Sequence, residues 1–133
     1  MPVSLVPVTS IDPIWPYLRE GFEAACLKTG GDVSSGDLWV ACRSGSAFLI
    51  VASGEAIQGA SVWKQETWAT GRRLRCVMLY GANMDGWIED MRDMAMKIAR
   101  DCGATSLVAE GRPGWERIFK NARKLRVIYE ELI

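Results

Sequence analysis

The sequence predicts one α/β domain, an α+β arrangement in which a mostly antiparallel mixed sheet is flanked by helices. The first observation is residues 74–100, which read as a strand, a glycine-containing turn and an amphipathic helix. The second is the pair of apolar stretches at residues 47–52 and 57–63, which a short turn separates. With residues 74–80 as the next strand, these stretches predict three antiparallel strands in a row. At 133 residues the chain has the length of a single domain, so we expect residues 1–133 to fold as one unit.

The N-terminal part predicts one strand and two helices. Residues 3–8 are rich in valine and predict a strand, and the proline within them indicates an edge strand or the end of the strand. Asp12 and the proline after it open a helix, which the glycine pair beginning at Gly30 ends. Asp37 and the serines before it suit the start of a second helix. We therefore expect residues 38–43 to form a short helix, with a strand as the alternative.

The helix that follows the glycine-containing turn shows an apolar stripe with steps of three and four residues. Its members are Trp87, Met91, Met94, Ala95, Ile98 and Cys102. We expect Asn83 or Asp85 to cap the start of this helix and Gly103 to end it in a left-handed turn. Asp93 and Lys97 have the spacing and the order of a favourable ion pair on its surface.

The remaining elements lie on either side of this unit. Residues 65–72 are polar and predict a long turn between two strands. Residues 104–109 predict another short strand. A helix is expected from Trp115 to about Ala122. The side chains of residues 125–132 alternate with the two-residue period of a strand, which predicts a closing strand.

Composition excludes several classes of protein. The formal net charge is zero, so no overall charge selects nucleic acid or an anionic membrane surface. No apolar run reaches the roughly 18 residues of a membrane span, and the first residues lack the basic region of a signal peptide. The sequence has no histidine, which removes histidine-dependent triads and the usual zinc sites, and we expect no metal site. We expect a cytoplasmic protein.

The four cysteines are far apart in the sequence and form no Cys-x-x-Cys pair. They are Cys26, Cys42, Cys76 and Cys102. Spacing of this kind is typical of buried, reduced thiols in a cytosolic protein. One disulfide, or one reactive thiol, is the alternative.

The turn after residues 74–80 has two interpretations. Its candidate ligand-binding residues are Gly81, Ala82, Asn83, Met84 and Gly86. Glycines that lead into a helix can present unpaired backbone amides to a phosphate group. The same residues can equally form a capped turn without any ligand.

The order of elements resembles the GNAT fold of N-acetyltransferases over nearly the whole chain, and five short motifs resemble a narrower group of proteins with this fold. The motifs are Gly45-x-Ala47, the turn from Gly81 to Trp87, Cys102-Gly-Ala104, Gly111-Arg-Pro-Gly-Trp115 and Arg117-Ile-Phe-Lys120. More specifically, the chain resembles small GNAT-like proteins of tailed phages and prophages, including relatives of the T7-type internal virion proteins. This resemblance implies the fold, and it implies a role in a virion or an acetyltransferase activity.

The chain departs from the pattern of the active family members, which hold the pyrophosphate of acetyl-coenzyme A on a Gln/Arg-x-x-Gly-x-Gly/Ala loop. Residues 80–86 occupy that place here, without the basic residue and the second close glycine. Asp85, Glu89 and Asp90 offset the positive end of the helix but would repel a diphosphate. The family tyrosine that protonates the leaving thiolate corresponds to Phe119. We therefore expect no cofactor, or acetyl-coenzyme A if the protein is nevertheless an enzyme.

Three residues are candidates for acid-base chemistry near the groove that the resemblance implies. Glu66 and Glu110 could act as a general base through water, and Tyr80 could act as an acid. A solvated charge is the alternative for each glutamate, and packing is the alternative for the tyrosine.

A second set of residues is a candidate interaction surface. Trp68 lies within the polar turn, where an exposed indole would favour contact with a partner. The basic members are Arg112, Arg117, Lys120, Arg123, Lys124 and Arg126. They could meet an anionic partner or a cofactor phosphate, or form a solvated helix face.

Two functions follow from these observations. The first is a phage-type GNAT-like protein with a degenerate site, which acts by binding a protein partner or by self-assembly in a virion. It would lie in the host cytoplasm and could be incorporated in the virion. The alternative is an active acetyl-coenzyme A-dependent N-acyltransferase that acts on an unknown amine.

Overall fold

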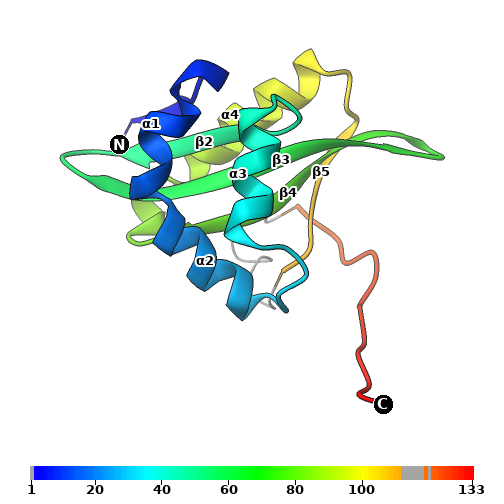
Figure 1. Ribbon diagram of the computed structural model, residues 1–133. Coiled ribbons are helices and arrows are strands. Elements are labelled where there is room, and N and C mark those ends of the chain that lie inside the picture. The colour runs from blue at the N-terminus through cyan, green and yellow to red at the C-terminus, as the bar shows by residue number, and fades with distance from the viewer. Residues whose placement is uncertain (1, 112–118, 120) are drawn as a thin grey trace.

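Five strands form one sheet whose spatial order follows the sequence, β1-β2-β3-β4-β5 (Figure 1). The strands are β1 Val3–Leu5, β2 Phe48–Ser53, β3 Ile57–Trp68, β4 Gly71–Gly81 and β5 Ser106–Ala109. Neighbouring strands are antiparallel except for β4 and β5, which are parallel. The structure is a computed structural model that describes residues 2–111, 119 and 121–133. The predicted fold class, a mostly antiparallel mixed sheet with flanking helices, is confirmed.

Three helices cover one face of the sheet, α1 Ile11–Ile14, α2 Arg19–Lys28 and α3 Ser35–Arg43 (Figure 1). The single helix expected after Asp12 is interrupted by a 3-10 turn, Trp15–Tyr17. Pro16 within that turn has no amide hydrogen to donate, so the regular hydrogen-bond ladder starts again only at α2. Another 3-10 turn, Val8–Ser10, occupies the end of the predicted first strand.

The short helix expected at residues 38–43 is confirmed as part of α3. The Ser34 hydroxyl accepts from the Asp37 amide at 3.1 Å, and the Asp37 carboxylate accepts from the Ser34 amide at 2.9 Å. This reciprocal pair satisfies two amides that a helix start leaves free. Leu38 and Cys42 then point into the core.

Helix α4, Ile88–Asp101, lies alone on the other face, after the 3-10 turn Met84–Gly86 (Figure 1). The predicted apolar stripe is confirmed, and its buried members Trp87, Met91, Ala95 and Ile98 are joined by Ala99. Each face therefore has its own apolar core, one under α1–α3 and one under α4.

The ends of α4 differ in part from the expectation. Trp87 is the N-cap residue, and neither Asn83 nor Asp85 caps the helix, because Asn83 precedes the 3-10 turn and Asp85 lies within it. Lys97 pairs with Asp101 at 3.1 Å, one turn further on, and not with Asp93. Gly103 has φ of 75°, the predicted left-handed conformation.

The polar residues 65–72 do not form a long turn, and this prediction is wrong. β3 and β4 pair from Gly59↔Gly81 to Trp68↔Gly71, with one register shift between Val62 and Trp63, so only residues 69 and 70 connect them. Side chains of this part are polar because both strands run beyond the helices (Figure 1). A sheet face that no helix covers has no need of apolar residues.

The C-terminal part differs most from the sequence prediction. The helix expected from Trp115 to about Ala122 lies largely outside the described residues. The closing strand expected at residues 125–132 is not formed, since the described residues 122–133 contain no regular secondary structure. A strand requires a neighbour for its hydrogen bonds, and the sequence pattern alone does not supply one.

The four cysteines are unpaired thiols. Cys26, Cys42 and Cys76 are buried, whereas Cys102 is half-buried. Burial raises the pKa of the Cys42 thiol to about 12 and also raises that of Cys76. Such thiols stay protonated at neutral pH, which makes them poor nucleophiles.

Candidate functional site

The candidate site lies where β4 extends past the end of β5 and continues through a turn into α4. Pairing between these strands ends at Cys76↔Ala109, although β4 continues to Gly81. Within the described residues, the last part of β4 therefore has no strand partner on the side of β5. An open strand edge of this kind can receive an extended ligand.

The turn from Gly81 to Trp87 is held by hydrogen bonds within it and to Gln58 of β3. The amide of Ala82 donates to the Gln58 carbonyl at 2.9 Å, and the Trp87 amide donates to the Met84 carbonyl at 3.0 Å. Asn83 has left-handed backbone angles, and its side-chain amide donates to the Gln58 side chain at 2.9 Å. These contacts fix the turn against β3 and close its end at Trp87.

The packing of the Trp87 indole accounts for glycine at positions 59 and 81. A Cβ on Gly81 would overlap the Trp87 ring, and a Cβ on Gly59 would lie 2.6 Å from that ring. The indole is 1% exposed, and its Nε1 donates to the Ala82 carbonyl at 2.8 Å. Gly81 therefore serves close packing of α4 against the sheet, a contact that the sequence motif alone does not reveal.

The turn does not fit the diphosphate of acetyl-coenzyme A. The exposed residues Asp85, Glu89 and Asp90 surround the start of α4. The sequence has no lysine or arginine from Gly81 to Met91. An anion here would meet negative charge, with no cation from the turn to balance it.

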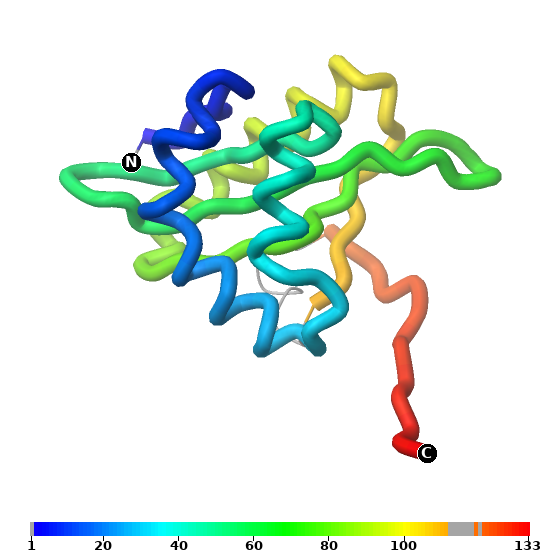
Figure 2. Tube along the Cα trace, in the orientation of Figure 1, coloured from blue at the N-terminus to red at the C-terminus, as the bar shows by residue number. Residues whose placement is uncertain are grey.

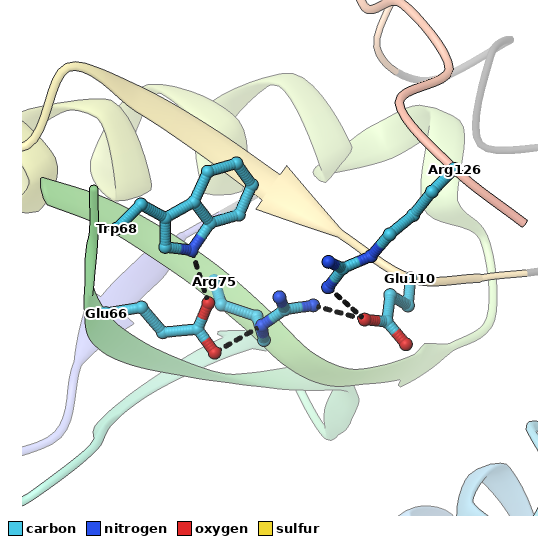
Figure 3. Close-up of polar contacts among 5 residues, drawn as sticks. All are labelled: Glu66, Trp68, Arg75, Glu110 and Arg126. Atoms are coloured by element: carbon cyan, nitrogen blue, oxygen red, sulfur yellow. Dashed lines mark hydrogen bonds and ion pairs between the residues drawn. The ribbon is translucent and has the colours of Figure 1, made fainter. Parts of the chain in front are cut away.

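Glu66 and Glu110 are brought together by a residue that sequence analysis did not select, Arg75 (Figure 3). The Arg75 Nε lies 2.6 Å from Glu66 Oε2, and its Nη1 lies 2.9 Å from Glu110 Oε1. The Arg75 side chain is 16% exposed, compared with 31% for Glu66 and 44% for Glu110. The signal that could have identified Arg75 is the strand register, since the antiparallel β3 and the parallel β5 bring one glutamate to each side of β4.

This arrangement changes the protonation of Glu66. The hydrogen bond from Arg75 holds the pKa of the Glu66 carboxyl below its usual range, and a hydrogen bond from Trp68 lowers it further. The Arg75 pKa is raised, chiefly by the same hydrogen bond to Glu66. A carboxylate with a lowered pKa that accepts from a guanidinium is a weak general base.

Trp68 is half-buried and is not the freely exposed indole that the sequence suggested. Its Nε1 donates to Glu66 Oε1 at 2.9 Å, as Figure 3 shows. The Arg73 guanidinium carbon lies 4.8 Å from the centre of the Trp68 ring, within the range of a cation–π contact. Trp68 thus belongs to the same polar cluster as Glu66 and Arg75.

Tyr80 packs among apolar groups. Its ring meets the Phe22 ring edge to face, with centroids 4.9 Å apart. A Cβ on Gly21 would overlap the same ring, so α2 lies directly on it. Desolvation by burial raises the pKa of Tyr80, which makes it a poorer acid at neutral pH.

The predicted basic surface is only partly within the described residues. Arg123, Lys124 and Arg126 are exposed, and Arg126 Nη2 lies 3.3 Å from Glu110 Oε1 (Figure 3). Arg112, Arg117 and Lys120 lie outside the described part of the chain. Phe119 packs against the core under α4.

The described residues hold no group of three or more His, Cys, Asp or Glu side chains that could bind a metal ion. Within the same residues, no helix has the length and apolar character of a membrane span.

Replacing Arg75 with methionine is expected to lower the free energy of unfolding by about 1–2 kcal/mol at pH 7. The folded pKa of Glu66 lies below its unfolded value of about 4.3. The contribution of this carboxylate to stability is therefore complete above the unfolded pKa and is lost as pH falls through the folded pKa. Urea unfolding at pH 7 and at about pH 3 should show the cost of the substitution shrinking in acid.

The matched control for this prediction is Lys64→Met. Lys64 is exposed and lies opposite Arg75 in the register of β3 and β4. We expect a change within about 0.5 kcal/mol. If the two substitutions cost the same, the ion pairs of Arg75 do not stabilise the fold.

The fold was compared with known proteins. No protein-family model matches the chain, and no match was found among curated proteins. An aminoglycoside acetyltransferase from an uncultured soil metagenomic sample has a TM-score of 0.72 at 12% identity, over 99% of this chain and 97% of the other. The ribosomal-protein-alanine N-acetyltransferase of Brucella melitensis has a TM-score of 0.65 at 12% identity, over 98% of each chain.

A third similar structure is a predicted acetyltransferase of Clostridium acetobutylicum, solved with acetyl-coenzyme A. Its TM-score is 0.69 at 11% identity, over 99% of this chain and 95% of the other. None of the three is described as a phage protein, so the finer resemblance to virion proteins stays a prediction. At these identities the likeness concerns the fold alone, and this chain has the GNAT fold of N-acetyltransferases, as its order of elements predicted.

Proposed function

We propose that this protein acts by binding a protein partner through a GNAT-fold scaffold and does not transfer acyl groups. The observation that carries the proposal is the turn before α4. There the Trp87 indole covers Gly59 and Gly81, and carboxylates stand at the start of the helix. A ligand with two phosphates would find neither a cation from the turn nor an open glycine backbone.

The candidate acid-base residues support the same proposal. Glu66 and Glu110 both accept hydrogen bonds from Arg75, and Tyr80 is packed between Phe22 and the backbone of Gly21. A general base needs a lone pair that is free to take a proton from the attacking group. The guanidinium of Arg75 takes up a lone pair on each glutamate, and α2 packs on the Tyr80 ring.

The partner surface in this proposal contains Trp68 and the basic C-terminal residues. Trp68 is half-buried in the cluster around Arg75, so one part of its ring remains available for contact. The exposed cations of the C-terminal segment would steer an acidic partner and make its association sensitive to salt. The resemblance to phage GNAT-like proteins points to a partner within an assembling virion.

The second candidate is an acyl-coenzyme A-dependent N-acyltransferase. One observation favours it, the open edge of β4 beyond Cys76, in a fold shared with an acetyltransferase that was solved with acetyl-coenzyme A. The two functions differ in whether the cofactor binds.

Calorimetric titration with acetyl-coenzyme A is expected to show a dissociation constant of about 1 mM or weaker, equivalent to about −4 kcal/mol. The physical reason is the negative charge around the start of α4. A double variant, Asp85→Asn with Glu89→Gln, removes two of these charges and is expected to bind the cofactor more tightly than the natural chain. A low-micromolar constant for the natural chain, about −8 kcal/mol, would contradict the proposal and favour the enzyme.

Trp68→Ala is expected to weaken capture of the partner by about 2 kcal/mol or more, roughly 30-fold. The immobilised natural chain, Trp68→Ala and the control Thr67→Ala would be compared in capture from a phage-infected cell extract, with bound proteins identified by mass spectrometry. Thr67 is exposed and adjacent in β3, so its loss should not change capture. Equal capture by all three chains, or a large fall in melting temperature for Trp68→Ala alone, would show that Trp68 has only a structural role.

A further inference from the structure

The C-terminal segment, residues 122–133, is exposed throughout and leads away from the sheet and helices (Figure 2). It carries six large apolar side chains, each at least 54% exposed. They are Leu125, Val127, Ile128, Tyr129, Leu132 and Ile133. So many neighbouring apolar groups in water mark a segment that is covered in its working state.

The sequence of this segment suits a β-strand. Residues 125–133 contain no glycine or proline, and Val127, Ile128 and Tyr129 are types enriched in strands. What the segment lacks in the structure is a neighbouring strand.

The sheet lacks a strand at one particular edge. Within the described residues, β5 is an end strand that pairs only with β4, so its outer backbone groups are unpaired. Leu107 and Val108 in its middle are only half-buried. An apolar edge strand with free amides and carbonyls is a template for another strand.

The Arg126–Glu110 ion pair places the segment beside this edge. Glu110 follows β5 directly, and Arg126 Nη2 lies 3.3 Å from its Oε1. The last residues of the chain do not return along β5 but lead outward to the C-terminus (Figure 1). Among the described residues, neither the segment nor the outer edge of β5 therefore has a strand partner.

We propose that residues 125–133 of one copy add as a strand to the outer edge of β5 in a second copy, giving a reciprocal two-fold dimer. Each copy then supplies the strand that the other lacks, and the outer edge of β5 becomes paired in both copies. The added strand covers the apolar side chains of the segment and pairs the outer backbone of β5. This inference does not rest on the proposed function, since strand addition needs neither the turn before α4 nor the bonds of Arg75, although Arg126 belongs both to the added strand and to the proposed partner surface.

The test compares the full natural chain with Ile128→Pro and Ile128→Thr by analytical ultracentrifugation at micromolar concentrations. Proline removes an amide donor from the middle of the added strand, whereas threonine keeps the amide and a β-branched side chain. We expect a dimer for the natural chain and for Ile128→Thr, and a dissociation constant raised by at least tenfold for Ile128→Pro. Hydrogen exchange should show the amides of β5 that point away from β4 protected in the dimer and fast in the proline variant, whereas those bonded to β4 stay protected in both.

Two outcomes would overturn the proposal. A natural chain that stays monomeric shows that the strand is not exchanged. In that case a lower melting temperature for Ile128→Pro alone would indicate that the segment docks on its own sheet. A dimer that persists unchanged in Ile128→Pro would show that another surface holds the copies together.

Discussion

Trp87→Ala is expected to lower the free energy of unfolding by about 3–5 kcal/mol, the usual cost of removing a buried tryptophan. The indole is 1% exposed and fills the space between α4 and the ends of β3 and β4. Because Gly59 and Gly81 have no side chains, neither residue can help to fill the cavity that its removal leaves. Urea unfolding monitored by circular dichroism would measure the loss.

The control for this prediction is Trp87→Phe. Phenylalanine keeps part of the ring volume but cannot donate the 2.8 Å hydrogen bond to the Ala82 carbonyl. We expect a smaller loss of about 1–2 kcal/mol. A loss below about 1 kcal/mol for Trp87→Ala would show that the indole is not packed over the glycines.

Gly59→Ala is expected to lower the free energy of unfolding by about 2–3 kcal/mol through overpacking. An added Cβ would lie 2.6 Å from Cζ2 of Trp87 and 2.6 Å from the backbone oxygen of Tyr80. The Tyr80 oxygen belongs to the neighbouring strand and cannot yield without breaking the pairing of β3 and β4. Thermal and urea unfolding of the variant would report the change.

The control glycine is Gly36 in α3, whose added Cβ would have only the Ser34 hydroxyl oxygen nearby, at 3.6 Å. Gly36→Ala should therefore raise stability by about 0.5–1 kcal/mol, since alanine is the better helix former. In a Trp87→Ala background, Gly59→Ala should cost less than it does alone, because one of its two clashes is gone. Equal costs in both backgrounds would mean that the indole does not restrict this position.

Local sequence signals were sufficient for most elements. The apolar stripe of α4 reflects a helix with one face on a core, and the capping pair Ser34 and Asp37 satisfies backbone groups within three residues of each other. Both effects are local, so the residues themselves predict them. The order of elements then indicated the GNAT fold. Only the prolines at the start, above all Pro16, divided a predicted helix.

Long-range pairing decided the elements that the sequence misjudged. Polar residues 65–72 read as a turn, yet in the structure they continue β3 and β4 because each strand provides the other with backbone partners. Residues 125–132 read as a strand, yet they have no strand partner among the described residues and remain irregular. Strand formation depends on a neighbour that can be far away in the sequence, and hydrophobic pattern does not identify it.

The candidate site also combines features that are local in the sequence with features that depend on long-range packing. The sequence by itself determined the negative charge at the start of α4, the absence of a cation in the turn and the positions of Glu66 and Glu110. Only the tertiary structure decided that Arg75 joins the two glutamates, because it lies on β4 between an antiparallel and a parallel neighbour. Only the structure decided that Gly81 accommodates the Trp87 indole, because a helix and a sheet approach closely only where a side chain is missing.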